Sequence, residues 1–184
     1  MRALLNLVLA IGLVLGLALP VQAQLLGDLE VRGGVFAHSV DEAMFDASRI
    51  EDVNVELLLG LPLVDQMTGP AVMLRPHVGA TINTEDLESM VYAGATLTVP
   101  LFGLPLFIEG SFGGAIHNGD LDKAVFPARD LGCSVLFRES ASLGVQITEA
   151  ASVMATVEHA SHAGLCGDDN RGLTNFGVRV GYKF

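Results

Sequence analysis

The sequence predicts an all-β protein, an eight-stranded antiparallel transmembrane β-barrel. Apolar and polar residues alternate in eight segments whose lengths, roughly 9 to 11 residues or slightly more, suit tilted membrane strands. The connections between these segments alternate between short and long, and the chain ends on an aromatic residue inside the last segment, Gly181-Tyr182-Lys183-Phe184. The sequence is 51% hydrophobic, but after the first segment no apolar run is long enough for a transmembrane helix. The apolar residues are therefore dispersed over strands.

The first 23 residues predict a secretory signal peptide. Arg2 is followed by an apolar run over 7–19 and by the small-residue cleavage site Val21-Gln22-Ala23. Residues 24–184 then form one outer-membrane β-barrel domain. Removing residues 1–23 takes away one cation and no acid, so the net charge moves from -11 to about -12. This charge argues against nucleic acid as a partner.

Eight segments carry the strand pattern. They are residues 27–38, 51–63, 70–83, 88–101, 105–117, 131–148, 151–162 and 172–184. Three connections are short, at 64–69, 102–104 and 149–150, whereas those after the first, fifth and seventh segments are longer and rich in Asp, Gly and Asn. Short periplasmic turns and longer outer loops are typical of outer-membrane barrels. The connection at 84–87 is a short exception.

The two faces of the predicted strands differ in charge. One face is almost wholly apolar, while the other carries nine ionisable residues: Glu30, Arg32, Glu56, Arg75, His77, Glu109, Arg138, Glu158 and Arg179. The lumen of an eight-stranded barrel is just wide enough for side chains, and charges buried there must be paired. Four arginines against four glutamates satisfy this requirement. A secreted lipocalin-like barrel, with the faces inverted, is the less favoured alternative because the chain ends on an aromatic strand residue.

A serine and a histidine lie close together near the end of the seventh segment. His159 and Ser161 share one strand face with Val153, Ala155 and Val157, because side chains alternate along a strand. A strand rising from the 149–150 turn places His159 about 20 to 25 Å up the membrane normal, at the outer-leaflet boundary and on the lipid face. A hydroxyl nucleophile beside a histidine base can attack an ester that lies in a membrane.

Glu139 is the candidate acid for this pair. If the sixth and seventh segments pair tightly around Glu149, residues 139 and 159 lie opposite each other. A carboxylate there can orient the imidazole and stabilise its protonated form. The alternatives are that His159 and Ser161 are rim residues in contact with headgroups, and that Glu139 binds cations that bridge lipid phosphates. His38 and His117 fall near outer strand ends, where we expect them to be solvated.

Two cysteines remain in the exported chain. Cys133 and Cys166 both fall toward the outer end, and a disulfide between them is expected in an oxidising compartment. It would close a loop of about 34 residues, worth roughly 3 to 4 kcal/mol in the chain-entropy model. No zinc-type cysteine spacing occurs, and His159 and His162 lie on opposite faces, so they do not form a common metal site.

The last 55 residues or so resemble a known family. Residues 159–184, with His-x-Ser-x-Ala-Gly, a short loop and a terminal strand, resemble the outer-membrane lipid A 3-O-deacylase family, also called acyloxyacyl hydrolases. Residues 137–144 are similar to the preceding strand of that family. The resemblance implies a hydrolase of the bacterial outer membrane that uses no cofactor and takes lipid A, within lipopolysaccharide, as its substrate among the outer-membrane lipids. The resemblance is compatible with a monomer or a homodimer.

By the same resemblance, Ser161 is the nucleophile and His159 the base in hydrolysis of the ester that joins a 3-hydroxyacyl chain to lipid A. Two positions depart from the family. His162 replaces an Asn assigned to the oxyanion, and Thr174 or Asn175 stands where the family has its acid. Thr174 points outward near Ser161 and can form a hydrogen bond, but it cannot supply a negative charge. Glu139 is therefore the substitute acid, with Asp168 and Asp169 in the adjacent loop as weaker candidates. A backbone N-H at Ala163 or Gly164 is the substitute oxyanion donor. The runner-up is a structural or lipopolysaccharide-binding barrel with an inactive remnant of the site.

Overall fold

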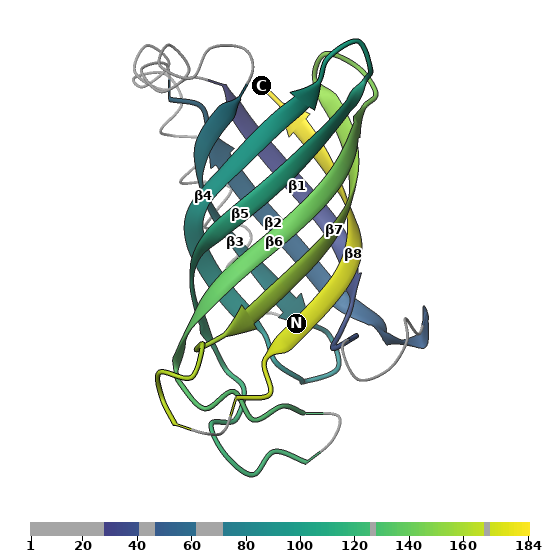
Figure 1. Cartoon of the computed structure of the whole chain (residues 1–184). Helices are drawn as coiled ribbons and strands as arrows, with labels where there is room; N and C mark the ends of the chain where they lie inside the picture. Colours follow the sequence, from purple (N-terminus) through teal and green to yellow (C-terminus); the bar gives the residue numbers. More distant parts are fainter. Residues whose placement is uncertain (1–27, 41–46, 62–71, 126–127, 168–169) are drawn as a thin grey trace, which may run out of the picture.

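The computed structural model describes residues 28–40, 47–61, 72–125, 128–167 and 170–184. They form a closed antiparallel β-barrel in which each strand pairs with the next and β8 pairs with β1 (Figure 1). The strands are β1 (Leu29–Ala37), β2 (Ile50–Leu59), β3 (Met73–Asn83), β4 (Met90–Leu101), β5 (Leu106–His117), β6 (Val135–Gln146), β7 (Ala151–Ser161) and β8 (Leu173–Lys183). The predicted fold class and all eight strands are confirmed. The predicted signal peptide, the 64–69 turn and the candidate acids Asp168 and Asp169 lie outside the described residues.

The two ends of the barrel differ as the connection lengths predict. The tight turns after β4 and β6 lie at the end where the chain terminates, and the longer loops after β5 and β7 lie at the opposite end (Figure 1). Strand β6 is shorter than expected from residues 131–148. The amides of Leu131 and Gly132 donate to the carbonyls of Asp120 and Leu121, so this segment pairs within its own loop. The side chain of Leu131 is buried against strand residues that include Tyr92 and Leu136.

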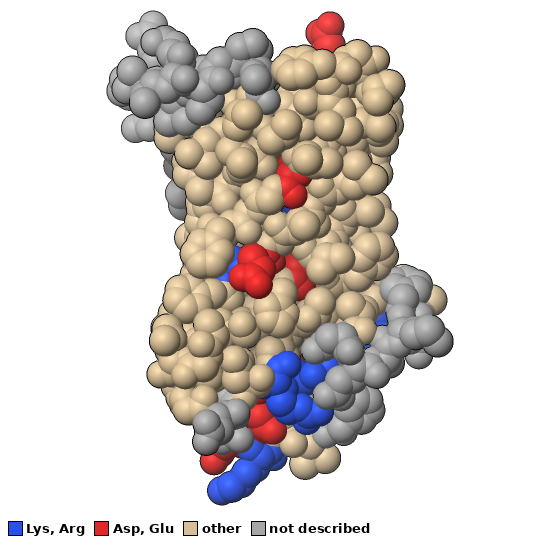
Figure 2. Space-filling view, in the orientation of Figure 1, with Lys and Arg blue, Asp and Glu red and all other residues tan. Residues whose placement is uncertain are grey.

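The outward face of the barrel is apolar. Side chains such as Val55, Val91, Val178 and Val180 point away from the lumen and are about half exposed. Figure 2 shows a largely uncharged band around the middle of the molecule, broken by a few acidic atoms, with cationic side chains gathered toward the loop end. The lipocalin-like alternative is wrong, because the apolar face is outside. No helix in the described part of the chain is long and apolar enough to cross a membrane.

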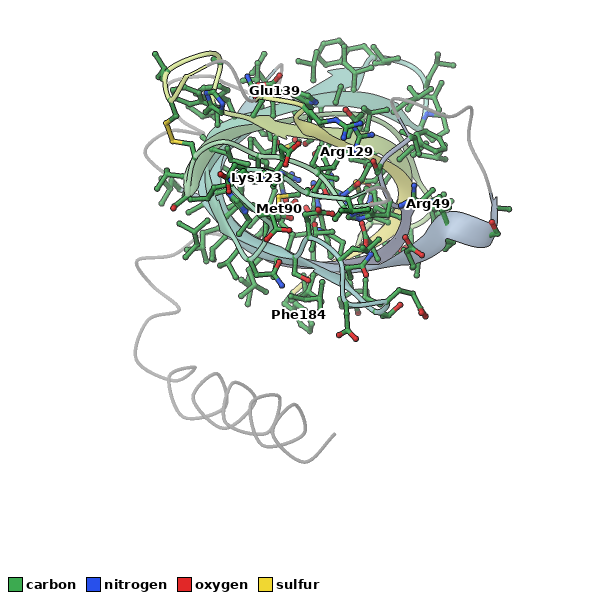
Figure 3. All side chains as sticks on the ribbon, turned by 90° about the horizontal axis from the view of Figure 1, so that it is seen from below. Arg49, Met90, Lys123, Arg129, Glu139 and Phe184 are labelled. Atoms are coloured by element: carbon green, nitrogen blue, oxygen red, sulfur yellow. A yellow bond between two sulfur atoms is a disulfide. The ribbon has the colours of Figure 1, made fainter. Side chains whose placement is uncertain are left out.

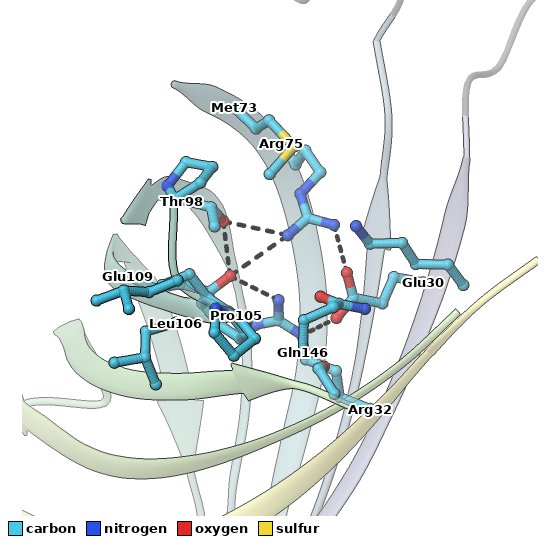
Figure 4. A pocket seen from close by; sticks show the side chains of 14 residues that line it. Glu30, Arg32, Met73, Arg75, Thr98, Pro105, Leu106, Glu109 and Gln146 are labelled. Carbon is cyan, nitrogen blue, oxygen red and sulfur yellow. Dashed lines mark hydrogen bonds and ion pairs between the residues drawn. The ribbon is translucent and has the colours of Figure 1, made fainter. Parts of the chain in front are cut away.

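The lumen holds the predicted charges in a network of ion pairs. Arg32 donates to both carboxylate oxygens of Glu109, at 2.7 and 2.8 Å. Around it, Arg75 bonds Glu30 and Thr98 beside a cavity of about 180 Å³ near the short-turn end (Figure 4). Two further arginines are also paired with glutamates: Arg138 with Glu158 at 2.8 Å, and Arg179 with Glu56 at 3.0 Å. These contacts offset the desolvation of charges in a narrow interior.

A second polar cluster closes the lumen at the loop end. His38 is fully buried, with Nδ1 3.0 Å from Asp52 and Nε2 2.9 Å from Glu88. Glu88 also accepts the backbone N-H of Arg129, which draws the β5–β6 loop over the opening. The expectation that His38 is solvated is therefore wrong, because its ring is buried between two carboxylates. His117 is partly exposed, and its Nε2 lies 2.6 Å from the carbonyl of Cys133.

Candidate active site

His159 and Ser161 lie on the outer face of β7, where this strand reaches the loop end. Both are partly exposed, and they alternate with Glu158 and Ala160, which are buried in the lumen. The strand register places Glu139 opposite His159 on β6 and Thr174 opposite His159 on β8. The predicted cross-strand pairing of residues 139 and 159 is confirmed. The three positions form one row across the lipid-facing surface.

The ring of His159 is held on two sides. Its Nδ1 lies 2.8 Å from the hydroxyl oxygen of Thr174, within hydrogen-bonding distance. Gly172, just before β8, lies against the Cε1–Nε2 edge: a Cβ there would come within 2.8 Å of Cε1 and 3.3 Å of Nε2. Gly172 has φ +62°, so both its backbone conformation and the ring beside it favour glycine. The imidazole thus has a defined orientation, with Nδ1 engaged.

Glu139 faces His159 across the strands without bonding to it. Its side chain is exposed on the outside of the barrel wall (Figure 3). Among the described residues, no hydrogen bond or ion pair joins this carboxylate to the imidazole. The register therefore brings the proposed acid to the right position in the row, while the contact with Nδ1 is made by Thr174.

Two further candidate positions do not lie on the exposed surface of the site. His162 is buried, as strand parity predicts, and its Nδ1 accepts the backbone N-H of Cys166. Asn175 is also buried, where it donates to Glu158 and accepts the N-H of Ser39. Thr174 is thus the one of the two substitute positions in early β8 that lies on the site's face.

The loop that follows Ser161 is tied to the neighbouring loop. Cys133 and Cys166 form a disulfide, as expected. This bridge and Leu165 line an apolar groove of about 330 Å³. Phe112 and Phe137 also line it, and their stacked rings have centroids 5.8 Å apart. Phe137 lies directly opposite Ser161 in the strand register. The groove therefore adjoins the serine and offers apolar walls to part of a lipid.

The chain turns sharply just beyond Ser161. Ala163 and Gly164 have φ values of +52° and +77°, and the N-H of Leu165 donates to the carbonyl of His162. Within the described residues, no acceptor is bonded to the N-H of either Ala163 or Gly164. Both amides therefore remain candidates for an oxyanion donor.

Two residues of the site were not predicted from the sequence. The contact of Gly172 with His159 depends on how the β7–β8 loop returns to the sheet, and the position of Phe137 beside Ser161 depends on the groove. The hairpin register that identified Glu139 also places 137 opposite 161, so it could have indicated Phe137. No group of three or more His, Cys, Asp or Glu residues suited to a metal ion occurs in the part of the chain that the structure describes.

The apolar outer belt, paired lumen charges and closed eight-stranded topology define an outer-membrane β-barrel with a Ser-His pair on its lipid-facing rim. The family model for lipid A 3-O-deacylase (PagL) matches residues 64–183. The chain therefore belongs to this family of lipid A deacylases, and it is a protein of the bacterial outer membrane.

Solved structures share the fold. The crystal structure of the outer membrane enzyme PagL is similar with a TM-score of 0.55 and 16% identity, over 85% of this chain and 99% of that chain. The N-terminal β-barrel domain of Pseudomonas aeruginosa OprF is similar with a TM-score of 0.54 and 14% identity, over 85% of this chain and 97% of that chain. Among curated proteins, no sequence matches.

Proposed function

We propose that this protein removes the 3-O-linked hydroxyacyl chain of lipid A by a serine esterase mechanism. The observation that carries the proposal is the placement of Ser161 and an oriented His159 on the lipid-facing rim of a barrel of the lipid A 3-O-deacylase family. There, an ester of an outer-leaflet lipid reaches the serine without leaving the membrane. The apolar groove beside Phe137 receives the part of the substrate next to the ester.

In this mechanism Ser161 Oγ attacks the ester carbonyl, and His159 Nε2 takes the hydroxyl proton. The amides of Ala163 and Gly164 are the proposed donors to the oxyanion. The imidazolium returns the proton to the sugar oxygen as the ester bond breaks. A water molecule, deprotonated by His159, then releases the acyl chain and restores Ser161. Glu139, opposite His159, would stabilise the imidazolium through its negative charge in the poorly solvated lipid boundary.

A structural or lipopolysaccharide-binding barrel is the second candidate. The observation in its favour is that Glu139 makes no ion pair with His159 within the described residues, so the pair lacks a directly bonded carboxylate. Under this reading lipid A is bound but not cleaved, and replacing Ser161 leaves the lipid composition unchanged. Both candidate functions, the esterase and the binding barrel, are compatible with a homodimer.

Mass spectrometry of lipid A from expressing cells tests the proposal. The wild type is expected to produce lipid A that has lost one hydroxyacyl mass, and Ser161→Ala at matched membrane levels is expected to leave lipid A intact. Ser152→Ala, on the inner face of the same strand, is the matched control and should retain deacylation. Intact lipid A in cells with folded wild type, given a substrate that carries the 3-O-acyl chain, would instead support the binding barrel.

A further inference from the structure

The imidazole of His159 is hydrogen-bonded to a hydroxyl group. In a serine esterase the base needs a partner on one ring nitrogen, because that partner fixes the tautomer and leaves the other nitrogen unprotonated. Here the contact is between Nδ1 and Thr174 Oγ1, at 2.8 Å. The oxygen of a threonine hydroxyl can accept a hydrogen bond from Nδ1–H, but it cannot supply a negative charge.

The alternative partners on the neighbouring strands do not reach Nδ1. Asn175 is turned into the lumen, where both ends of its amide are bonded. Glu139 lies opposite His159 on the other side, yet no hydrogen bond joins the two in the part of the chain that is described. Thr174 is thus the side chain that the register and the contact distance both assign to the ring.

Thr174 is itself held in place by the end of β1. The carbonyl of Thr174 accepts the backbone N-H of Val40 at 2.8 Å, and the adjacent Asn175 accepts the N-H of Ser39 at 3.0 Å. Ser39 in turn accepts a hydrogen bond from the buried Arg129 at 2.6 Å. Because the backbone of Thr174 is fixed in this way, its side chain can orient the ring without a backbone rearrangement, as a preorganised site requires.

We propose that Thr174 is the positioning residue for His159, so that a neutral hydroxyl orients the base and the charge comes from Glu139 without contact. The inference rests on the proposed function and deepens it. Nδ1 keeps its proton and donates a hydrogen bond to Thr174 Oγ1, and the unprotonated Nε2 is left to take the proton of Ser161. The two tasks of a triad acid, orientation and charge stabilisation, are divided between two strands.

Three substitutions test this assignment in the full chain in detergent with purified lipid A. Thr174→Val removes the hydroxyl at nearly constant shape, and kcat is expected to fall about tenfold with KM unchanged, the loss typical of one neutral hydrogen bond. Thr174→Ser keeps the hydroxyl and should recover most of the activity. Thr174→Glu places a carboxylate beside the ring, which should raise kcat and move the acid limb of the pH profile to higher pH.

The results separate this inference from the proposed function. If Thr174→Val keeps the wild-type kcat and pH profile while Ser161→Ala is inactive, the function stands and the role of Thr174 is refuted. If wild type and Ser161→Ala are equally inactive, the function fails. In that case the nitrogen NMR shifts of His159 still decide the matter. The protonated Nδ1 tautomer is expected in the wild type and should be lost in Thr174→Val; no difference between the two would overturn the assignment.

Discussion

Polar groups in the lumen of this barrel have many bonded partners, whereas those on the lipid-facing rim have few. In the lumen, Glu56 lies within 3.0 to 3.8 Å of three arginines and also accepts the hydroxyl of Tyr92. On the rim, His159 has one side-chain hydrogen bond, to Thr174, and Glu139 has no bonded partner among the described residues. The two regions are separated by a single layer of backbone.

This difference separates structural polar groups from chemically available ones. A charge that is paired with fixed neighbours has little capacity left for a substrate, and its loss leaves its partners unpaired in a poorly solvated interior. A polar group at a membrane boundary that has a donor or acceptor atom without a hydrogen-bond partner can bind a ligand or transfer a proton. We therefore expect lumen substitutions to change stability, and rim substitutions to change activity.

The largest expected effect is on activity at the rim. His159→Asn removes the proposed base, so kcat/KM should fall by about a thousandfold or more, as for other hydrolases that lose this group. Stability should change by less than about 0.5 kcal/mol, because the side chain is partly exposed and leaves no buried charge. Deacylation rates and heat-modified gel mobility measure the two quantities. A variant that loses activity only because it unfolds would contradict the comparison.

The complementary change is in the lumen. Glu56→Gln leaves Arg32, Arg138 and Arg179 without their shared negative charge, which should lower the free energy of unfolding by about 3 to 5 kcal/mol. Urea unfolding in detergent measures this loss. Glu149→Gln, an exposed acid in the β6–β7 turn, is the matched control and should be neutral. Equal stability of both variants would show that the lumen network is not structural.

The disulfide lies at the boundary between the two regions. Replacing Cys133 and Cys166 together by serine should lower stability by about 2 to 4 kcal/mol and loosen the loop that follows Ser161. Because this bridge also lines the groove, KM should rise more than kcat falls. Reductant should reproduce both effects in the wild type and leave the double variant unchanged. A reductant effect on the double variant would point to a different cause.

The strands and their faces could be predicted because alternation is a local property with a period of two residues. The same rule placed Glu139 opposite His159, and Cys133 near Cys166, from hairpin register and loop position. The contact between His159 and Thr174 depends on the register between β7 and β8. A long loop joins these strands, and its length does not determine their register as a tight hairpin turn would. His38 was missed for a similar reason, since its partners Asp52, Glu88 and the β5–β6 loop come together only when the loops close the lumen.

The smallest expected effect is the pH dependence of the stability that the His38 cluster contributes at the loop end of the lumen. Burial alone would lower the pKa of His38, but its bonds to Asp52 and Glu88 raise it from 6.5 to about 9. The protonated ring thus stabilises the fold below pH 6.5, and this contribution is lost as the pH rises from 6.5 through 9. His38→Gln should remove the decline in stability between these values, as measured by urea unfolding at several pH values. If the variant declines as the wild type does, the loops are held closed by other contacts.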